Sequence, residues 1–299
     1  MLKEQVNYVQ DVTKKYIKMK VFVLGYTGML GRYVYSHFKE KGYDVVGLTR
    51  KDIDAGDTNV QMRSPLVASG AKAFDVVINC MGTIKPQVDK FGSVNAIKVN
   101  SLFPHMLASV CNEMGFKLIH ITTDCVFSGN DGNYNEDSLH DCTDVYGKTK
   151  SLGEPENCTV VRTSIIGEEF GTARSLIEWV KSEDGNTVNG YLNHQWNGLT
   201  CYQVAKVFEN IIKNETYWDG VRHIYSPNSL NKHQLVQAIA LAHELDIKVN
   251  PVDGPSKCDR TLSTKHFDTE NFTPFSWSFD IPDIHTQLVE QYNHPPHKE

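Results

Sequence analysis

Three glycines between a predicted strand and a predicted helix constrain the fold of this chain more than any other feature. Residues 19–25 form an apolar run typical of a buried strand, and Gly28 and Gly31 follow Gly25 at intervals of three before a helical pattern through Phe38. In such a turn the first glycine allows the bend, the second lets the backbone approach a pyrophosphate, and the third lets helix and strand pack closely. The helix start adds free N–H groups and a positive dipole end. The pattern predicts dinucleotide binding, with a plain tight turn as the alternative.

The end of the next predicted strand indicates which dinucleotide binds. Residues 43–48 are apolar and lead into Thr49, Arg50 and Lys51. An acidic residue at this strand end suits the ribose hydroxyls of NAD, whereas a basic residue suits the 2′-phosphate of NADP. Arg50 therefore favours NADPH, and a solvated basic turn is the alternative. Asp54 follows where we expect a third strand to bring a carboxylate near the adenine.

Strands and helices alternate along residues 19–166, which predicts an α/β fold on a Rossmann-type doubly wound parallel sheet. The further predicted strands share hydrophobic, β-branched sequences: residues 74–80, 118–127 and 159–166. Beyond Gly167 helices alternate with polar, aromatic-bearing loops, so residues 167–299 are predicted to form mainly a smaller substrate-binding lobe, with some later segments returning to the first domain. Residues 1–18 are predicted to be an N-terminal extension without an assigned function.

Composition argues against several classes of protein. Of the 299 residues 22% are charged, and the formal net charge of −6 argues against a general binder of nucleic acids or membrane surfaces. The apolar runs are too short for a transmembrane helix, and the N-terminal residues lack the apolar core of a secretory signal. The seven cysteines are scattered without a Cys-x-x-Cys, which favours free thiols in the cytoplasm and disfavours a metal site.

Polar residues gather at 122–125, where the apolar run that begins at Leu118 ends. In a parallel α/β sheet, ligands bind just outside the carboxyl ends of the strands. Further along, Tyr146 and Lys150 are four residues apart, which on a helix places them on one face. A nearby ammonium lowers the pKa of a phenol from its free value of about 10. We therefore expect Tyr146 to act as a proton donor, with a chance spacing on a helix as the alternative.

These features resemble the extended short-chain dehydrogenase/reductases over roughly residues 19–280. The two signatures of that family are the glycine turn and Tyr146-x-x-x-Lys150. Several strings are similar to its dTDP-4-dehydrorhamnose reductase branch: FDVVINC, VNSLFPHMLA, ITTDCVFSG, YGKTKSLGE, VVRTSIIG and RTLST. The resemblance implies NADPH-dependent reduction of a ketone on a nucleotide sugar.

The resemblance also implies roles for individual residues. Thr123 matches the residue that hydrogen-bonds the keto oxygen, Tyr146 the general acid that protonates it, and Lys150 the residue that holds the nicotinamide ribose. The residues expected to contact the cofactor are Gly25, Thr27, Gly28, Met29, Leu30, Gly31, Arg50, Asp54, Cys80, Met81, Gly82, Asn100, Tyr146 and Lys150. For Asn100, a satisfied amide inside a helix is the alternative.

Cys125 departs from the branch pattern, which usually has Tyr after Thr-Asp. A Cys at this place resembles relatives that combine 3,5-epimerisation with 4-reduction, the GDP-fucose synthases and the plant UDP-rhamnose synthases. In those relatives the thiol acts on carbons alpha to the C4 ketone, so Cys125 is predicted to be a catalytic base. The alternative is a small buried residue that fills the space of the tyrosine.

The partner acid of such an epimerase is a His or Lys on the helix after the strand at 159–166. An approximate alignment places Trp179 or its neighbours there, with Lys181 nearby. His194 is a second candidate.

Substrate contacts are expected chiefly from the second lobe. The predicted residues are Thr83, Asp124, His194, Trp196, Asn197 and Arg260. An aromatic and an amide suit a base and a sugar, and an Arg suits a diphosphate through its fork of donors. A packed loop with a structural Trp is the alternative for residues 194–197.

The leading hypothesis is an NADPH-dependent 4-ketoreductase, with 3,5-epimerase activity, that acts on a nucleotide-linked 4-keto-6-deoxy-hexose and gives a UDP- or dTDP-L-rhamnose product. A plain 4-reductase fed by a separate epimerase is the next alternative. A third is a non-catalytic NADP-binding subunit, because the regulatory subunit of methionine adenosyltransferase resembles the same branch. The sequence leaves the oligomeric state open, a homodimer included.

Overall fold

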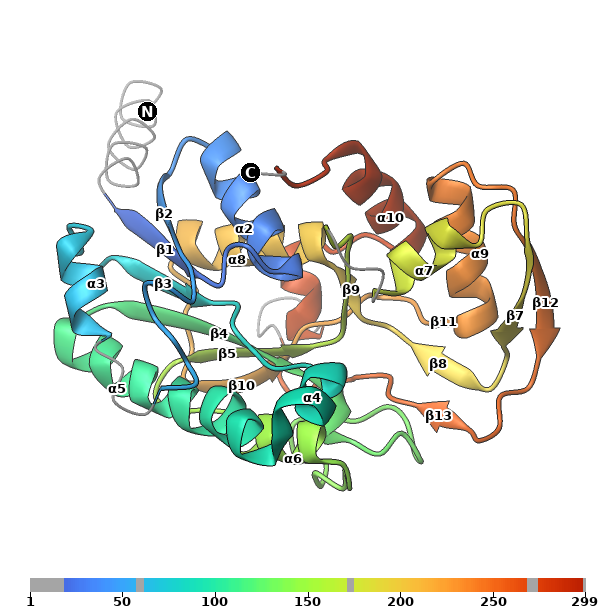
Figure 1. Ribbon diagram of the computed structural model, residues 1–299, viewed down its shortest axis with the longest axis horizontal. Coiled ribbons are helices and arrows are strands. Elements are labelled where there is room, and N and C mark those ends of the chain that lie inside the picture. The colour runs from blue at the N-terminus through green and yellow to red at the C-terminus, as the bar shows by residue number, and fades with distance from the viewer. Residues whose placement is uncertain (1–18, 58–61, 171–174, 268–273, 298–299) are drawn as a thin grey trace.

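The structure is a computed structural model that describes residues 19–57, 62–170, 175–267 and 274–297 (Figure 1). It consists of a large lobe around one sheet and a smaller lobe beside it. The predicted N-terminal extension, residues 1–18, lies outside the described residues.

A six-stranded sheet forms the centre of the large lobe, in the order β10-β5-β4-β3-β1-β2, with every pairing parallel. Its strands are β1 (Lys20–Leu24), β2 (Asp44–Leu48), β3 (Val76–Asn79), β4 (Lys117–Thr123), β5 (Thr159–Thr163) and β10 (Gly220–His223). The order reverses at β1, which pairs with β2 on one side and with β3 on the other. Open α/β sheets bind their ligands at such a reversal. The predicted Rossmann-type α/β fold is confirmed.

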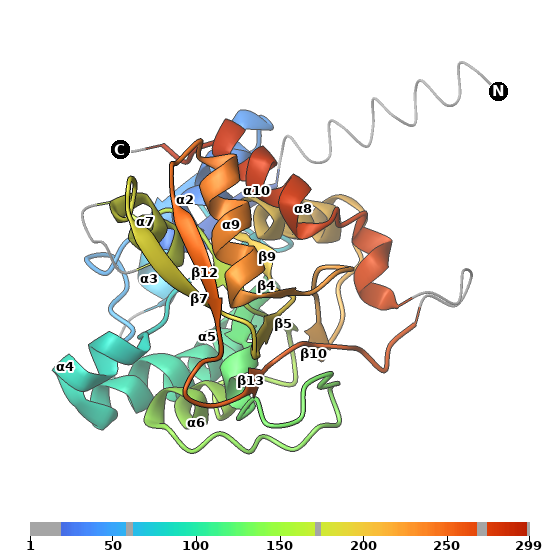
Figure 2. The ribbon, with the colours of Figure 1, turned by 90° about the vertical axis from the view of Figure 1, so that its right-hand side faces the viewer.

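Helices cover both faces of this sheet, as the two ribbon views show (Figures 1 and 2). One face carries α2 (Met29–Glu40) and α8 (Cys201–Lys213), and the other carries α3 (Arg63–Ala68) and α5 (Phe103–Met114). Alternate residues of β1 serve the two layers. Val21 and Val23 pack in the cluster with α2, and Phe22 and Leu24 pack in the cluster with α5. A strand buried on both faces needs an uninterrupted apolar sequence, which is what residues 19–25 have.

The smaller lobe packs three helices against short strands. Its helices are α7 (Leu176–Ser182), α9 (Lys232–Ala242) and α10 (Ile284–Asn293). The strands are β7 (Thr187–Tyr191), parallel to β12 (Lys248–Val252), and β8 (His194–Trp196), which lies between β11 (Leu230–Asn231) and β13 (Cys258–Asp259). The pair β6 (Ile165–Ile166) and β9 (Leu199–Thr200) joins the two lobes, and η3 (Phe275–Phe279) precedes α10. Two elements beyond residue 166, β10 and α8, belong to the large lobe.

The third strand that we expected near Asp54 does not form within residues 49–57. Two local carboxylates bind backbone N–H groups there instead. Asp52 accepts from the Thr49 amide at 2.8 Å, and Asp54 accepts from the Gly56 amide at 2.9 Å. Such side-chain bonds to nearby backbone stabilise turns in competition with a strand.

A long helical run lies between β3 and β4. It consists of α4 (Lys85–Ala96), the π-helical turn η1 (Ile97–Leu102) and α5. Pro104 stands at the start of α5 and lacks the N–H that a regular helix would use there. Opposite this run, α6 (Val145–Ser151) carries Tyr146 and Lys150.

In the part of the chain that the structure describes, no helix is long and apolar enough to cross a membrane. All seven cysteines are free thiols. Among the described residues, no group of three or more His, Cys, Asp or Glu is arranged to hold a metal ion.

Candidate active site

The glycine turn between β1 and α2 is built for close backbone contact. Gly25 has a φ of +74°, and its amide donates to the Leu48 carbonyl at 2.8 Å, which fixes the turn beside the end of β2. A Cβ on Gly31 would lie 2.1 Å from the Gly25 carbonyl oxygen, so only glycine fits there. At Gly28, the residue that precedes α2, a Cβ would meet only the Gly25 oxygen, at 3.3 Å. The backbone at Gly28 is therefore open on its outer side.

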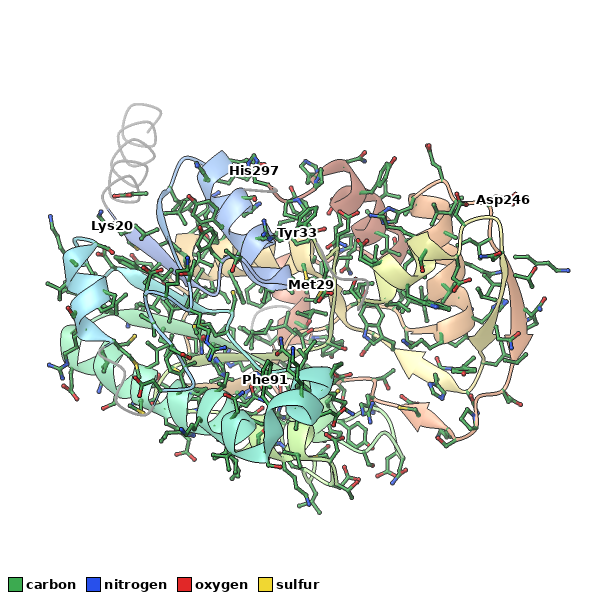
Figure 3. All side chains as sticks on the ribbon, viewed as in Figure 1. Lys20, Met29, Tyr33, Phe91, Asp246 and His297 are labelled. Carbon is green, nitrogen blue, oxygen red and sulfur yellow. The ribbon has the colours of Figure 1, made fainter. Side chains whose placement is uncertain are left out.

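The start of α2 has no side-chain cap among the described residues. The first N–H groups of a helix have no partner within the helix, and the positive end of the dipole favours anions. Ser, Thr, Asp or Asn usually satisfies them, but here the preceding residue is Gly28. Figure 3 labels Met29 at this end of α2, on the side where the two lobes meet. An uncapped helix start beside an open glycine turn is suited to a pyrophosphate.

A cavity of about 260 Å³ lies at the carboxyl ends of β1, β3, β4 and β5, and we call it the carboxyl-edge cavity. It is lined by Gly28, Met29, Leu30, Cys80, Met81, Gly82, Thr83, Ile84, Gln87, Ile121, Thr122, Thr123, Tyr146, Lys150, Thr163, Ile165 and Glu169. Most of the predicted cofactor residues and all three residues predicted for the ketone reduction, Thr123, Tyr146 and Lys150, thus surround one space. Strands distant in sequence supply them because parallel strands end at the same edge.

Tyr146 is positioned by tight packing between α6 and the turn that follows β4. Asp144 caps α6 by accepting from the Gly147 amide at 2.9 Å. A Cβ on Gly147 would lie 2.4 Å from the Cys125 carbonyl oxygen, so glycine lets the helix rest directly on the short η2 (Asp124–Val126). This contact brings the Tyr146 phenol within hydrogen-bonding reach of the Thr123 hydroxyl.

Lys150 is buried one turn further along α6, with 6% of its surface exposed. Its ammonium donates to the Ile121 carbonyl at 3.3 Å. Burial disfavours the charged form and lowers the pKa of Lys150 to about 8, against an opposing effect of Glu154.

The expectation that Lys150 lowers the pKa of Tyr146 is wrong for this structure. Burial raises the pKa of the phenol above its usual range, and the nearby Cys125 acts in the same direction, while the hydrogen bond with Thr123 acts against them. The Lys150 ammonium is directed at the Ile121 carbonyl, and burial dominates. Tyr146 therefore carries its proton at neutral pH, as a proton donor must.

The predicted cofactor residues at the end of β2 lie outside the cavity lining. Arg50 is 73% exposed, and its Nε is 3.1 Å from a carboxylate oxygen of Asp54. Because the Gly25 amide bonds to the Leu48 carbonyl, this basic turn lies beside the glycine turn.

Asn100 is buried and has its amide occupied. Its side-chain oxygen accepts from the Thr83 amide at 2.8 Å, and its nitrogen donates to the Thr83 carbonyl at 2.9 Å and to the Thr149 hydroxyl at 3.2 Å. Asn100 thus links the segment after β3 to α6 and fixes the position of Thr83, which lines the cavity.

Cys125 lies in η2, next to Thr123 and Asp124, and is partly exposed. Burial raises the pKa of its thiol to about 12, and the Asp124 carboxylate adds to this, although Arg260, Thr123 and Lys85 act in the opposite direction. The thiol is protonated at neutral pH. The thiolate expected from the sequence is therefore disfavoured in this environment.

The two candidates for a partner acid are bound elsewhere. Lys181 pairs with Glu168 at 3.0 Å and with Glu178 at 3.3 Å. His194 has its Nε2 3.0 Å from the Ser256 carbonyl and its ring against Tyr191. Trp179 lies on α7 and is about one third exposed, at 36%. Neither Lys181 nor His194 lines the cavity that contains Tyr146.

The predicted substrate residues of the second lobe differ in how far their side chains are already engaged by hydrogen bonds and packing. Asn197 is buried, and its amide exchanges two hydrogen bonds with the Leu262 backbone, at 2.8 and 2.9 Å. The Trp196 ring packs against Gly198, where a Cβ would lie 2.6 Å from it. Arg260 donates from Nε to the Phe127 carbonyl at 2.8 Å and from Nη2 to the Ser128 carbonyl at 3.0 Å. Its guanidinium is thus fixed beside the loop that follows η2.

Some residues at the site were not expected from the sequence. Gln87 and Thr163 line the cavity, and Lys232 at the start of α9 is close enough to Asp124 for the two charges to interact. Thr163 ends β5, so the rule that polar groups at strand ends face the ligand could have identified it. No comparable rule identifies a lysine at the start of a helix from a single sequence.

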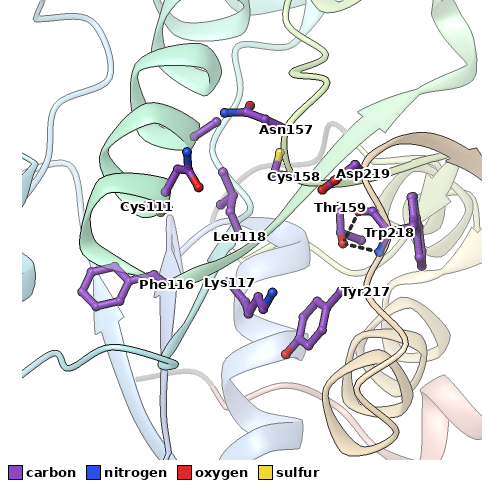
Figure 4. Close-up of a pocket in the computed structure, with 12 residues that line it drawn as sticks. Cys111, Phe116, Lys117, Leu118, Asn157, Cys158, Thr159, Tyr217, Trp218 and Asp219 are labelled. Carbon is purple, nitrogen blue, oxygen red and sulfur yellow. Dashed lines mark hydrogen bonds between the residues drawn. The ribbon is translucent and has the colours of Figure 1, made fainter.

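A second cavity, of about 290 Å³, lies at the opposite edge of the sheet, and we call it the amino-edge cavity (Figure 4). It is lined by Ala108, Cys111, Asn112, Phe116, Lys117, Leu118, Asn157, Cys158, Thr159, Tyr217, Trp218 and Asp219. Thr159 donates to the Trp218 carbonyl at 2.8 Å and accepts from the Trp218 amide at 3.1 Å. None of the residues predicted to act in catalysis lines it.

Two kinds of known protein are similar to this chain: sugar-nucleotide reductases and a subunit of methionine adenosyltransferase. The chain is 30% identical over 182 residues to dTDP-4-keto-6-deoxy-D-glucose reductase of Streptomyces niveus, which covers 58% of this chain and 62% of that protein. It is 27% identical over 258 residues to methionine adenosyltransferase 2 subunit beta of Danio rerio, which covers 80% and 79%. The chain spans about half to three fifths of the length of several curated relatives that it matches, between 49% and 62%.

A solved structure and a family match extend the comparison to most of the chain. The structure of dTDP-4-dehydrorhamnose reductase from Bacillus anthracis in complex with NADP superposes with a TM-score of 0.71 at 18% identity, over 92% of this chain and 99% of that one. At this identity the likeness concerns the fold. Residues 19–288 match the family described as the RmlD substrate binding domain. Since that match covers most of the sequence, the chain belongs to the RmlD substrate-binding domain family.

Proposed function

We propose that the protein binds NADPH and reduces the C4 ketone of a nucleotide-linked 4-keto-6-deoxy-hexose. One observation carries the proposal: Thr123, Tyr146 and Lys150 line a single cavity together with the uncapped start of α2. Membership of the family and the similarity to a sugar-nucleotide reductase support the same reaction.

The residues present fit NADPH. The uncapped α2 offers N–H donors to a pyrophosphate, and the open backbone at Gly28 leaves room for it. Arg50, beside this turn, offers a planar fork of donors to the 2′-phosphate. The NADP in the Bacillus anthracis structure supports this choice of cofactor.

Three polar groups of the cavity have a part in the proposed reduction. Bound NADPH supplies the hydride. Tyr146, which burial keeps as a phenol, donates its proton to the keto oxygen. Thr123 hydrogen-bonds that oxygen and orients the Tyr146 hydroxyl, while Lys150 holds the nicotinamide ribose.

Combined 3,5-epimerisation, which a UDP- or dTDP-linked L-rhamnose product would require, is the weaker extension of this proposal. Its base would be Cys125, whose pKa burial raises to about 12. Its acid would be Lys181 or His194, and both are engaged by other groups. A plain 4-reductase supplied by a separate epimerase agrees better with these contacts.

A non-catalytic NADP-binding regulatory subunit is a second candidate function. The match to methionine adenosyltransferase 2 subunit beta, over 80% of the chain, favours it. Such a subunit needs the dinucleotide site but not the proton donor, so NADPH binding without turnover would distinguish it from the reductase.

The test uses the full chain with NADPH in deuterated water, and UDP-, dTDP- or GDP-4-keto-6-deoxy-glucose as the substrate. Oxidation of NADPH is followed at 340 nm, and the product is analysed by NMR and mass spectrometry. We expect a reduced sugar without deuterium at C3 or C5. Deuterium at both carbons would establish epimerisation by this chain. NADPH binding with no reduction of any of the three, either alone or after treatment with a separate 3,5-epimerase, would overturn the proposed reaction in favour of the regulatory subunit.

The oligomeric state stays open, a homodimer included, and the cytoplasmic location stays a prediction. Neither enters the proposed reaction, since all the groups invoked come from one chain.

A further inference from the structure

A buried arginine, Arg162, joins β5 to the segment after α6 and to β10. Its side chain is 2% exposed. Its Nε donates to one carboxylate oxygen of Glu154 at 3.0 Å, and Nη2 donates to the other. Nη1 lies 2.8 Å from Nε2 of His223, and Nη2 lies 2.9 Å from Nε2 of His140. We call these four residues the Arg162 cluster.

The contacts with Arg162 require both histidines to be neutral. A guanidinium has only donors, so each Nε2 that faces Arg162 accepts a hydrogen bond and carries no proton. The proton of each neutral ring is then on Nδ1. In His223 this atom faces two backbone carbonyls, at 2.8 and 3.1 Å, and in His140 it lies 2.6 Å from the Ser151 hydroxyl. All of these partners are able to accept that proton.

His140 is half-buried, and its charged neighbours come from three segments of the chain. Burial and then Arg162 on β5 lower the pKa of His140, while Glu154 after α6 and the adjacent Asp141 act in the opposite direction. The Glu154 carboxylate is bound to the guanidinium, and the Asp141 carboxylate accepts from the Ser128 amide at 2.7 Å. Both carboxylates thus bond to groups other than the His140 ring.

His223 is fully buried on β10. Burial and then Arg162 lower its pKa to about 4, against the opposing effect of Glu136. The Glu136 carboxylate accepts from the backbone N–H of His223, at 2.8 Å, and not from its ring. Since His140 is less buried than His223, His140 is the first member of the cluster to take up a proton when the pH falls.

The cluster lies at the end of the helix that carries the proposed proton donor. α6 has seven residues, too few to be stable through its own backbone hydrogen bonds alone. Asp144 caps its start, one turn from Tyr146. At its other end Ser151 directly follows Lys150 and contacts His140. The contacts at the two ends of α6 therefore help to hold Tyr146 and Lys150 in place.

Another histidine, His105 on α5, also contacts the end of α6. Its Nε2 lies 2.8 Å from the Leu152 carbonyl. A carbonyl accepts from a neutral or from a charged ring, so this bond survives protonation. The bond between Arg162 and His140 does not, because a protonated Nε2 would place one donor against another. Acid should therefore break the contact of His140 and leave that of His105.

We propose that Arg162 and His140 are positioning residues for the reduction, which fix the end of α6 and with it Tyr146 and Lys150. The inference rests on the proposed function, because Tyr146 and Lys150 act there as proton donor and ribose ligand. The four residues of the Arg162 cluster lie outside the lining of the carboxyl-edge cavity, so they act through α6.

This arrangement predicts how activity depends on pH. The folded protein keeps His140 neutral, whereas a histidine released from the cluster takes up a proton at its ordinary pKa of about 6.5. Release of this end of α6 therefore becomes easier as the pH falls below that value. Activity should have an acid limb that His140 determines.

The test compares the unmodified full chain with His140→Gln and His105→Gln between about pH 5 and pH 8, the range in which a histidine changes charge. Over this range His223, with its pKa of about 4, stays neutral. The substitution His140→Gln keeps an oxygen that accepts from Arg162 and removes the titrating ring. The readouts are kcat/KM for the ketosugar and the protection of α6 amides against hydrogen exchange, with α8 as the internal reference.

In the unmodified protein we expect kcat/KM to fall below a pH of about 6.5, by up to about tenfold per unit, and the protection of α6 to fall with it. His140→Gln should lose this acid limb in both readouts. At neutral pH its kcat/KM should stay within about threefold, as the loss of one neutral hydrogen bond allows. His105→Gln, the matched control, should keep the limb.

Arg162→Lys keeps the charge but not the planar fork of donors. It should lower kcat per folded molecule about tenfold or more, because misplaced reacting groups react slowly, while KM changes less. If this variant does not fold, the two histidine variants still decide the inference.

An acid limb that persists in His140→Gln would overturn the inference and leave the proposed function intact. A limb lost equally in both histidine variants would overturn it too. If the unmodified protein reduces no ketosugar, with or without a separate 3,5-epimerase, the proposed function is overturned, and hydrogen exchange alone decides the positioning of α6. Protection that falls with pH in the unmodified protein but not in His140→Gln would support it, and equal protection in the two would overturn it.

Discussion

The two cavities at opposite edges of the sheet have similar volumes and similar residues, yet only one has the features of an active site. Their volumes are about 260 and 290 Å³. The carboxyl-edge cavity has a threonine, a tyrosine and a lysine, namely Thr123, Tyr146 and Lys150. The amino-edge cavity has the same three types: Thr159, Tyr217 and Lys117. Residue types in a hollow therefore do not distinguish them.

Electrostatics and burial do distinguish them. α2 begins at the carboxyl edge and offers free N–H groups to an anion. α5 ends at the amino edge, where its last turn lines the cavity, and a helix end presents carbonyl groups that repel an anion. Lys150 is buried, whereas Lys117 is exposed with its ammonium 5.5 Å from the centre of the Tyr217 ring. The direction of the parallel strands thus decides which cavity suits a dinucleotide.

The largest expected effect separates the two tyrosines. Tyr146→Phe removes the proton donor and should lower kcat for ketone reduction about 10²- to 10⁴-fold, while the dissociation constant for NADPH changes little. Tyr217→Phe makes the same chemical change at the amino edge and should leave kcat unchanged. Steady-state kinetics and NADPH fluorescence measure both. Equal loss of NADPH binding and turnover in Tyr146→Phe would contradict its assignment as the proton donor.

Substitution of the two threonines should have different main effects: at Thr123 on activity, and at Thr159 on stability. Thr123→Val removes a hydroxyl from the keto oxygen and should lower kcat about 10²-fold, as loss of one such donor does. Thr159→Val leaves the Trp218 backbone amide and carbonyl without their partner and should lower the free energy of unfolding by about 1–3 kcal/mol. Urea unfolding and kcat per folded molecule give the two readouts. A loss of activity in Thr159→Val that stability does not explain would contradict the distinction between the edges.

The sequence predicted the carboxyl edge because its signals are local. The spacing of Gly25, Gly28 and Gly31 reflects contacts within one turn, and Tyr146 and Lys150 share one face of a single helix. Asn100 and Asn197 show the limit. The sequence alone does not show whether an asparagine amide is bound to the backbone or is free to bind a ligand. The structure shows this through the hydrogen-bond partner, which for Asn197 is the Leu262 backbone.

Predictions from the sequence failed where the outcome depends on distant parts of the chain. Burial raises the pKa of Tyr146, and Cys125, which is distant in sequence, acts in the same direction. Lys232 lies close enough to Asp124 for their charges to interact because segments far apart in sequence pack together. A different failure is local: no strand forms within residues 49–57, where carboxylates bind nearby backbone N–H groups instead.

The two lysines should differ in how they shape the pH profile. Below a pH of about 8 Lys150 is an ammonium, and above it a growing fraction is the neutral amine, because burial lowers its pKa. The profile of kcat/KM reports groups of the free enzyme, so it should fall about tenfold per unit well above that pH. Lys150→Arg keeps its charge and should lose this alkaline limb, at a lower overall rate. Lys117→Met should keep the limb. An unchanged limb in Lys150→Arg would assign it to another group.

The smallest expected effect tests how far the carboxyl-edge site extends beyond its cavity. Arg50 is exposed and its contact with the 2′-phosphate is screened by water, so Arg50→Ala should raise the dissociation constant for NADPH only about fivefold and leave that for NADH unchanged. Lys51→Ala removes the same charge from the neighbouring residue and should change neither. Equal weakening in the two variants would mean that the basic turn acts as a diffuse positive field. A change confined to Arg50 would place a specific contact at the end of β2, beyond the buried groups, and would show that the choice of cofactor is made at the exposed rim while the chemistry is performed in the buried part.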